Sequence, residues 1–252
     1  MGINIGIDGN GHFIGGGEIV QNDNLILHLD PYDFASMGLN NQSTMRDLSA
    51  YENDVTLVGT AKNKSSGHWH FDGSNDFAYR TDDSDFDFST STDFTIQLWV
   101  YLDTDSDMGI IQKGNFGSTG WYLYYNSTSN AIVFGGHTTT SLLSTTSDVS
   151  TTQWFNIALV ADRDANVKLY INGDLKTTYG NETDNVNVTT DGSGADPEAK
   201  HLIIGGKQTS NSTSATTDDF DGHIGPVLIY KDILTENEIN QNFDVYRGIY
   251  GI

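Results

Sequence analysis

The hydrophobic pattern along the chain is that of short β-strands. In residues 94–102, apolar side chains alternate with polar or amphipathic ones, and the second set consists of Thr95, Gln97, Trp99 and Tyr101. A period of two residues is typical of a strand that turns one face toward a core. This segment therefore predicts a strand that buries one face and presents an amphipathic second face.

Further apolar runs, each bounded by turn-forming residues, predict additional strands. They cover residues 25–29, 55–58, 69–71, 77–79, 110–112, 121–125, 131–134, 154–161, 167–171, 202–204 and 223–230. Asn172-Gly173 predicts a type I′ hairpin after one of these runs, because both residues tolerate positive φ. About a dozen short antiparallel strands fit one all-β domain, a two-sheet antiparallel jelly-roll sandwich over residues 23–252.

The pattern also predicts one helix, close to the C-terminus. Thr235 and Glu238 form the Thr-x-x-Glu capping box that starts it. The apolar stripe that follows consists of Ile239, Phe243 and Tyr246. We expect the helix to end at Gly248 and to lie on one edge or face of the sandwich.

Three segments depart from the strand pattern. Residues 1–22 are rich in glycine and lack apolar periodicity, so we expect a flexible N-terminal arm that serves as an anchor. Polar stretches at about 181–200 and 207–220 are longer than ordinary connections between strands. Loops of that length usually carry function or disorder.

Charge and composition narrow the choice of partners. The 252 residues include 12 Lys and Arg against 34 Asp and Glu, which gives a net charge of −22. A polyanion repels phosphate, so we expect neither nucleic acid nor an anionic membrane as a partner. The chain has no Cys and no apolar run of the ~20 residues that span a bilayer. Its first residues show neither the basic region nor the apolar region of a secretion signal, so we do not expect Sec secretion. Core burial must therefore stabilise the fold without disulfides.

Several motifs in a fixed order carry a family resemblance. They lie at residues 71–77, 94–101, 154–160, 169–173, 222–225 and 234–239. Together they resemble the concanavalin A-like superfamily in its laminin-G-like and pentraxin-like branch, over about residues 25–246. The resemblance implies a two-sheet jelly-roll sandwich with a short C-terminal helix, and the fold alone implies no function.

The two ends of the patterned region narrow the resemblance. Residues 24–30 with 46–49, and residues 241–252, resemble laminin-G-like virion proteins of tailed bacteriophages. This resemblance implies a non-enzymatic structural protein on the capsid or tail of a particle. Its expected partners are other virion proteins, a host-surface glycan and further copies of the chain in a homo-oligomer. The alternative is a secreted or cell-surface carbohydrate-binding lectin.

Catalysis is not expected from the carboxylates. Superfamily members that cleave β-glucans carry Glu-x-Asp-x-Glu or Glu-x-Asp-x-x-Glu on one strand, where a period of two aims acid and nucleophile at the same bond. No such motif occurs in this sequence. The nearest candidates are the alternating aspartates of residues 83–87 and 103–107, which lie in turn-like sequence. We therefore expect a protein that is not an enzyme.

Calcium is the metal that this composition favours, because carboxylates and loop carbonyls are hard oxygen ligands. Three places compete for it. They are Asp218 with Asp219, Asp72 with Asn75 and Asp76, and the group Asp103, Asp105 and Asp107. Lys207 stands where pentraxin-type relatives have an acidic ligand, which argues against their double-calcium site. For Asp72 and Asp76 the competing interpretation is structural, with carboxylates that accept backbone N–H bonds in a tight turn.

Aromatic residues offer candidate glycan contacts. Ring faces stack on the C–H surfaces of pyranoses, and nearby amides bind the hydroxyls. The candidates are Asn115, Trp121, Tyr122 and Tyr124, with Trp99 and Tyr101 on the second face of their strand. The alternative is that these rings fill the core or meet a neighbouring subunit. We expect His68 and His70 to form a surface pair, because Trp69 and Phe71 define the core face of that strand.

Overall fold

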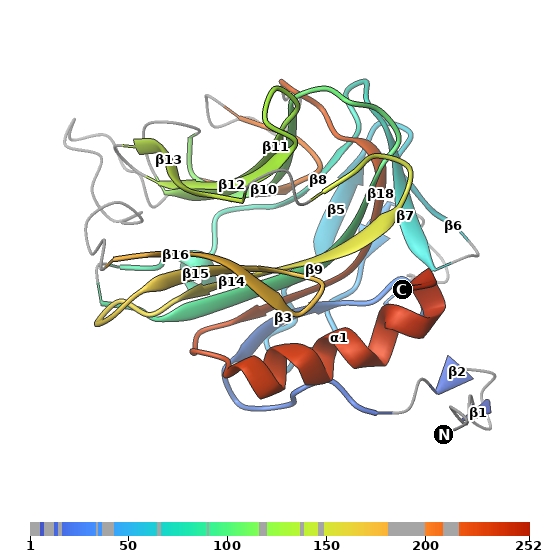
Figure 1. Ribbon diagram of the computed structural model, residues 1–252. Helices are drawn as coiled ribbons and strands as arrows, with labels where there is room; N and C mark the ends of the chain where they lie inside the picture. Colours follow the sequence, from blue (N-terminus) through green and yellow to red (C-terminus); the bar gives the residue numbers. More distant parts are fainter. Residues whose placement is uncertain are drawn as a thin grey trace.

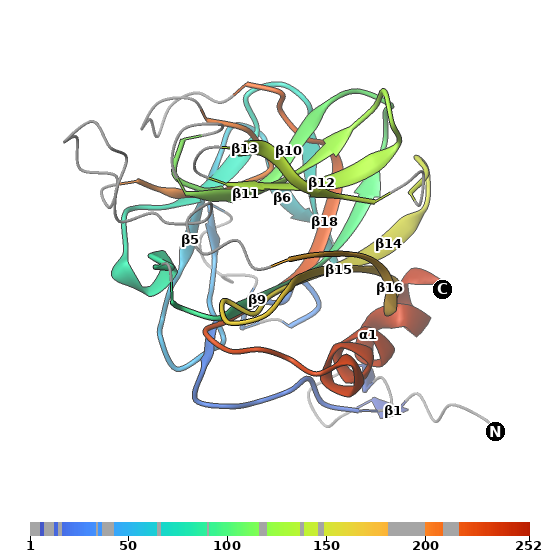
Figure 2. The same cartoon turned by 60° about the vertical axis from the view of Figure 1, so that its left-hand side comes forward.

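The computed structural model describes residues 6–7, 13–14, 17–33, 35–36, 43–64, 67–89, 91–115, 120–136, 139–145, 149–180, 200–208 and 217–252. Within these ranges two antiparallel sheets face each other, and one helix covers the outer side of the second sheet (Figure 1). The turned view shows the same three layers (Figure 2). The prediction of an all-β two-sheet sandwich with a short C-terminal helix is confirmed.

The first sheet has the strand order β13-β12-β11-β10-β17-β8-β5-β4. Its strands are β4 (Thr44–Met45), β5 (Val55–Val58), β8 (Phe77–Arg80), β10 (Met108–Lys113), β11 (Trp121–Asn126), β12 (Ala131–Gly136), β13 (Thr139–Ser144) and β17 (Leu202–Ile204). A 3₁₀ helix, η1 (Ser84–Phe86), follows β8.

The second sheet has the order β16-β15-β14-β9-β18-β7-β6, and β3 also pairs with β18. Its strands are β3 (Leu25–Leu29), β6 (Lys62–Lys64), β7 (His68–Asp72), β9 (Phe94–Leu102), β14 (Trp154–Ala161), β15 (Val167–Ile171), β16 (Asp174–Tyr179) and β18 (Asp221–Tyr230). A separate pair consists of β1 (Gly6–Ile7) and β2 (Phe13–Ile14). Each strand predicted from the sequence has its counterpart in one of the two sheets.

Strand β18 changes its partner half-way along. Its first half pairs with β7 and its second half with β3, while β9 lies along its other side. The register shifts between Ile224 and Val227, so Gly225 and Pro226 form an irregularity at the switch. Proline donates no hydrogen bond to a ladder, and a bulge is the place where a central strand can hold it.

The alternation in β9 divides the apolar residues between two layers. Its five apolar side chains are fully buried between the sheets. On the opposite face Trp99 lies in a second apolar cluster under the helix, while Tyr101, beyond the helix, stays partly exposed. Burial of each large apolar side chain contributes about 1.5–3 kcal/mol. The amphipathic second face therefore serves to seat the helix.

Helix α1 (Glu236–Tyr250) begins as predicted and ends later than predicted. Thr235 and Glu238 form the reciprocal capping box. The sequence predicted an end at Gly248, but the helix continues to Tyr250 and Gly251 takes the left-handed conformation at its end, with φ 77°. A Cβ at Gly248 would meet no atom within 4 Å. Gly248 is therefore an exposed position that the helix tolerates, at a cost of about 1 kcal/mol relative to Ala.

The last residues of the predicted N-terminal arm belong to the sandwich. Residues 18–20 pack on the sandwich, since Ile19 is buried and the Val20 N–H donates to Asn242 Oδ1 at 2.7 Å. The Tyr230 hydroxyl donates to the Val20 carbonyl at 2.9 Å. Of the two predicted long loops, residues 181–199 and 209–216 lie outside the described residues. The described α-helix is too short and too polar to cross a bilayer.

Candidate functional site

The outer face of the second sheet is left uncovered just beyond the end of α1. There, side chains from four neighbouring strands form what we call the histidine–tryptophan patch. It consists of His68 and His70 on β7, His223 on β18, Tyr101 on β9 and Trp154 on β14. All five side chains are partly exposed.

The register of the sheet brings these side chains into one row. His70 lies opposite His223, and His223 lies opposite Tyr101 on the other side of β18. Tyr101 in turn lies opposite Trp154. The ring centroids of His70 and His223 are 4.9 Å apart, and those of Tyr101 and Trp154 are 5.7 Å apart. Directly opposed side chains of antiparallel strands are close enough for such contacts.

Tyr250, in the last turn of α1, supports Trp154. Their ring centroids are 4.1 Å apart, and the Tyr250 hydroxyl donates to the Gly67 carbonyl at 2.8 Å. Burial, and next the charge of Asp30, raise the pKa of Tyr250 well above its ordinary value, which keeps this hydroxyl a donor. A Cβ at Gly225 would lie 2.4 Å from the Tyr250 oxygen. Glycine is therefore what lets the ring approach β18.

A hollow of about 430 Å³ lies beside the patch. Aromatic rings and polar groups share its wall, which includes Tyr101, Trp154, Tyr250, Thr152, Gln153 and Asn172. Thr152 and Gln153 are exposed. The wall thus combines ring faces with hydroxyl and amide groups, which is the composition of a site for a polar organic ligand.

Asp103 stands at the edge of the patch. Its Oδ2 lies 3.5 Å from His223 Nε2 and 3.9 Å from His70 Nε2. Asp105 and Asp107 point elsewhere, since Asp105 accepts from the Tyr125 hydroxyl at 2.7 Å and Asp107 accepts from the Ser127 N–H at 2.9 Å. The three aspartates predicted as a calcium group therefore do not converge.

The structure brings the other predicted calcium residues close to one another. The Asn75 N–H donates to Asp219 Oδ2 at 2.7 Å, so the turn of residues 72–76 and the loop of residues 218–222 are neighbours. Asp76 is buried and accepts from the N–H groups of Thr60 and Asp72 at 2.5 and 3.1 Å. Asp218 forms an ion pair with Lys207.

Protein groups thus satisfy Asp76 and Asp218, and these carboxylates do not form a calcium cage with Asp72 and Asp219. Calcium needs six to eight oxygen ligands at one point, whereas Asp76 acts as the acceptor at the centre of a turn. The contacts of Asp76 and Asp218 therefore favour a structural role for these carboxylates over a calcium centre. Calcium binding stays a prediction, and the structural interpretation of the turn is the one that these contacts support.

The predicted glycan residues are placed mostly away from solvent. Trp121 is fully buried in the core, where its ring is 5.6 Å from that of Phe88, and Tyr122 is 1% exposed. These two rings present no face to a ligand, because Trp121 faces the opposite sheet and Tyr122 packs against the backbone of Gly135. Asn115 and Tyr124 are partly exposed. The aromatic platform expected on this strand is thereby reduced to Tyr124.

The acidic run at residues 83–87 serves the fold. Asp83 caps η1 and pairs with Arg80 at 2.9 Å. Asp85 lies 3.6 Å from the Lys231 ammonium, and Asp87 lies 3.1 Å from the buried Lys113 ammonium. Each carboxylate is thus held by a cation, and the run does not present a pair of carboxylates across an open cleft.

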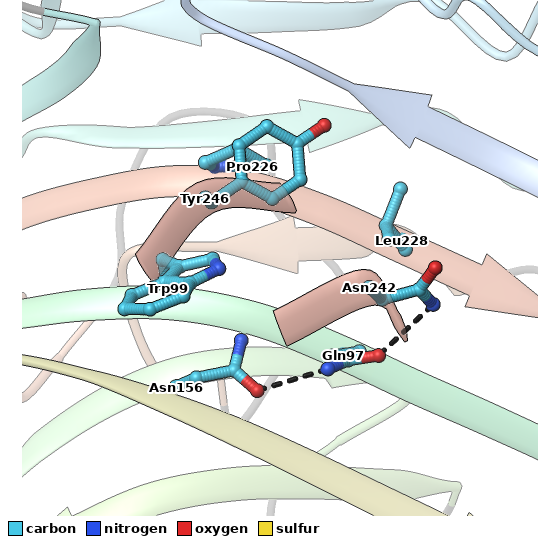
Figure 3. A pocket seen from close by; sticks show the side chains of 7 residues that line it. All are labelled: Gln97, Trp99, Asn156, Pro226, Leu228, Asn242 and Tyr246. Atoms are coloured by element: carbon cyan, nitrogen blue, oxygen red, sulfur yellow. Dashed lines mark hydrogen bonds between the residues drawn. The ribbon is translucent and has the colours of Figure 1, made fainter. Parts of the chain in front are cut away.

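Beneath α1, a set of buried amides joins the helix to the sheet (Figure 3). Gln97 Nε2 donates to Asn156 Oδ1 at 2.9 Å, and Asn242 Nδ2 donates to Gln97 Oε1 at 3.0 Å. The space that these side chains enclose with Trp99 and Tyr246 has no room for a water molecule. It is therefore a packed polar interface and not a binding site.

Comparison with known proteins agrees with this architecture. A laminin-G-type model of the concanavalin A-like lectin/glucanases superfamily matches residues 72–240, which is more than half of the chain. The chain belongs to this superfamily. No curated protein has a sequence that matches the chain.

Solved structures share the fold of this superfamily member at low sequence identity. The binding domain of botulinum neurotoxin serotype D has a TM-score of 0.61 and 17% identity, over 88% of this chain and 52% of that one. The Trypanosoma rangeli sialidase has a TM-score of 0.62 and 18% identity, over 91% of this chain and 33% of that one. The chain thus spans about half the length of the toxin domain, and identities at this level show the fold alone.

Sequence reasoning found some members of the patch and missed others. Tyr101 was identified from the alternation of its strand, and His68 and His70 were expected to form a surface pair. Trp154 was noted only as part of a family motif. Its outward direction follows from the alternation with the core residue Phe155, a signal that the sequence does contain. Tyr250 lay beyond the predicted end of the helix.

Proposed function

We propose that this module binds carbohydrate at the histidine–tryptophan patch. The observation that carries the proposal is the hollow in which the partly exposed rings of Tyr101 and Trp154 stand beside hydroxyl and amide groups. Aromatic faces stack on pyranose rings, and directional polar groups select the hydroxyls. Membership of a lectin/glucanase superfamily supports the proposal, as does a toxin binding domain of the same fold solved in complex with SialylT.

A glycan array tests the location as well as the activity. We expect wild-type protein to bind a limited set of glycans, and Trp154→Ala to reduce that signal by at least about tenfold because a stacking ring is lost. Tyr124→Ala is the matched control, since it removes the other partly exposed aromatic that the sequence offered. Loss of binding in Tyr124→Ala with retention in Trp154→Ala would move the site to β11, and an array without hits would reject carbohydrate binding.

We also propose that the module is not an enzyme. The glucanase carboxylate motif is missing from the sequence, and cations hold the aspartates of residues 83–87. Retaining and inverting glycosidases need two carboxyl groups across the bond they cleave. Incubation of the purified protein with β-glucans should release no sugar, and sustained release of sugar would overturn this proposal.

A tailed-phage particle is the setting that we propose for the module, on the capsid or the tail. The resemblance of residues 24–30, 46–49 and 241–252 to phage virion proteins supports it, as does the net charge of −22, which suits a hydrated outer surface. In that setting its partners are other virion proteins, further copies of itself and a host-surface glycan. A secreted or cell-surface lectin is the alternative.

Mass spectrometry of purified particles separates these settings, since the virion proposal requires the chain in the particle.

The anchoring role of the N-terminal arm has its own test. Deletion of residues 1–16 should abolish particle association and leave the melting temperature unchanged, because Ile19 and Val20 still pack on the sandwich. Retained association would reject the anchor.

A further inference from the structure

We propose that His70, His223 and Asp103 bind a divalent transition-metal ion of the zinc class. Among the described residues these three form the group in which histidine and carboxylate ligand atoms all lie within 4.8 Å of one another. They come from β7, from β18 and from the residue that follows β9, three neighbouring segments of one sheet.

The distances between the ligand atoms are close to those of a metal centre. Asp103 Oδ2 lies 3.5 Å from His223 Nε2 and 3.9 Å from His70 Nε2. With metal–ligand bonds of about 2.0–2.1 Å in a tetrahedron, ligand atoms are separated by about 3.3 Å. Side-chain rotations that move the atoms by less than about 1 Å therefore complete the geometry.

The backbone fixes the three positions before any ion binds. His70 and His223 are direct partners in the ladder between β7 and β18. The Asp103 N–H donates to the Asp221 carbonyl at 3.0 Å, which holds the aspartate beside β18. A Cβ at Gly222 would lie 2.1 Å from the Tyr101 carbonyl, so glycine allows the close approach of the two strands here. Ligands on paired strands are better fixed than ligands on loops.

The donor set selects the kind of metal. Two imidazole nitrogens with one carboxylate suit zinc, nickel, copper and cobalt, whereas calcium and magnesium need shells of oxygen. The side chains of His70, Asp103 and His223 are 31%, 34% and 21% exposed. Three protein ligands at an exposed edge leave the fourth position to water or to a ligand. This metal proposal does not depend on carbohydrate binding and is tested without any glycan.

Isothermal titration of the tag-free full chain with zinc chloride, after treatment with a chelator, tests the site. We expect one ion per chain, and a loss of affinity of at least about tenfold in each of His70→Gln, His223→Gln and Asp103→Asn. The matched controls are His201→Gln and Asp107→Asn, which make the same chemical changes outside the cluster. They should bind zinc like the wild type.

Cobalt supplies a second measurement that reports on the ligands themselves. Co²⁺ bound in a tetrahedral site of nitrogen and oxygen ligands gives visible absorption. We expect this absorption in the wild type, and we expect added zinc to abolish it by displacing the cobalt. The His223→Gln variant should not show the absorption. Melting curves of each variant confirm that it is folded. The proposal is overturned if the wild type binds no zinc, or if the controls lose affinity as much as the three ligand variants.

Discussion

The rings of Trp154 and Tyr250 lie with their centroids 4.1 Å apart at an interplanar angle of 40°. One belongs to the outer face of the second sheet and the other to the last turn of α1. This contact makes the end of the helix part of the wall beside the histidine–tryptophan patch. The stability of the helix end and the shape of the candidate site are therefore coupled.

Shortening the side chain at Tyr250 tests that coupling. We expect Tyr250→Ala to lower the free energy of unfolding by about 3–5 kcal/mol, as for other large buried aromatics. Tyr250→Phe keeps the ring and loses only the hydrogen bond to Gly67, which costs about 1 kcal/mol. Urea unfolding measures both values. Ile252→Ala, at an exposed position, is the control. An unchanged free energy of unfolding in Tyr250→Ala would contradict a supporting role of this ring.

The buried amides under α1 predict a non-additive pair of substitutions. In Asn242→Ala the Val20 N–H loses its acceptor and Gln97 Oε1 loses its donor. We therefore expect the free energy of unfolding to fall by about 2 kcal/mol. Because Gln97 and Asn242 share one bond, a double-mutant cycle with Gln97→Ala should give a coupling energy of about 1 kcal/mol. Gln241→Ala, next to it on the exposed side, should cost less than about 0.5 kcal/mol. Additive losses would disprove the network.

The Asp76 turn predicts a stability effect of the carboxylate. Asp76→Asn keeps the shape but loses the charge that accepts two backbone N–H groups and the Thr60 hydroxyl. We expect a loss of about 2 kcal/mol, since hydrogen bonds to charged groups are worth about 1.5–3 kcal/mol. Thermal or urea unfolding gives the value. Asp105→Asn, an exposed aspartate with a single tyrosine partner, is the comparison.

Calcium separates the two interpretations of the same turn. If the carboxylates of residues 72–76 and 218–219 bind the ion, millimolar calcium should raise the melting temperature above its value in chelator. The contacts of Asp76 and the ion pair of Asp218 with Lys207 lead us to expect no shift. A rise in melting temperature that Asp219→Asn abolishes would instead support calcium binding at these carboxylates.

His28 predicts how stability depends on pH. Burial lowers the pKa of His28 below its ordinary value, and the nearby Asp30, Asp47 and Asp33 act in the opposite direction. The unfolded chain therefore binds a proton near pH ~6.5 that the folded chain does not. Stability contributed by neutral His28 is present above that pH and is lost as the pH falls toward the lowered pKa.

The measurement is the free energy of unfolding at about pH 7.5 and about pH 5.5. Wild-type protein should lose more stability between them than His28→Gln, which cannot titrate. The raised pKa of buried Asp30 acts in the other direction, because the folded chain takes up a proton there more readily than the unfolded one. Equal pH profiles for the two proteins would remove His28 as a cause.

The fold was largely predictable because local signals agree with the packing. The alternation of β9, the Asn172-Gly173 turn with φ of 54° and 82°, and the Thr235 capping box each appear as expected. The helix end was wrong because Gly248 is a stop signal in local sequence, while tertiary contacts of Tyr250 extend the helix. Tertiary packing overrides such weak preferences.

The candidate site was predicted less well, since it depends on which strands are neighbours. His70, Tyr101, Trp154 and His223 are far apart along the sequence, and only the ladder order β7-β18-β9-β14 places them in one row. Alternation tells which face a side chain takes but not which sheet covers it. For that reason Trp121 looked like a possible platform and lies in the core.

The pairing of β3 with β18 has a consequence for how the protein is made. Leu29 lies opposite Val227 in this ladder, so a strand near the beginning of the sandwich pairs with a strand almost two hundred residues later in the sequence. Contacts of such high sequence separation slow folding, because a long loop must close before they are gained. During synthesis on a ribosome, β3 cannot complete its pairing with β18 until residue 230 has emerged. Until then β3, whose five residues are all buried in the folded chain, lacks the strand with which it pairs.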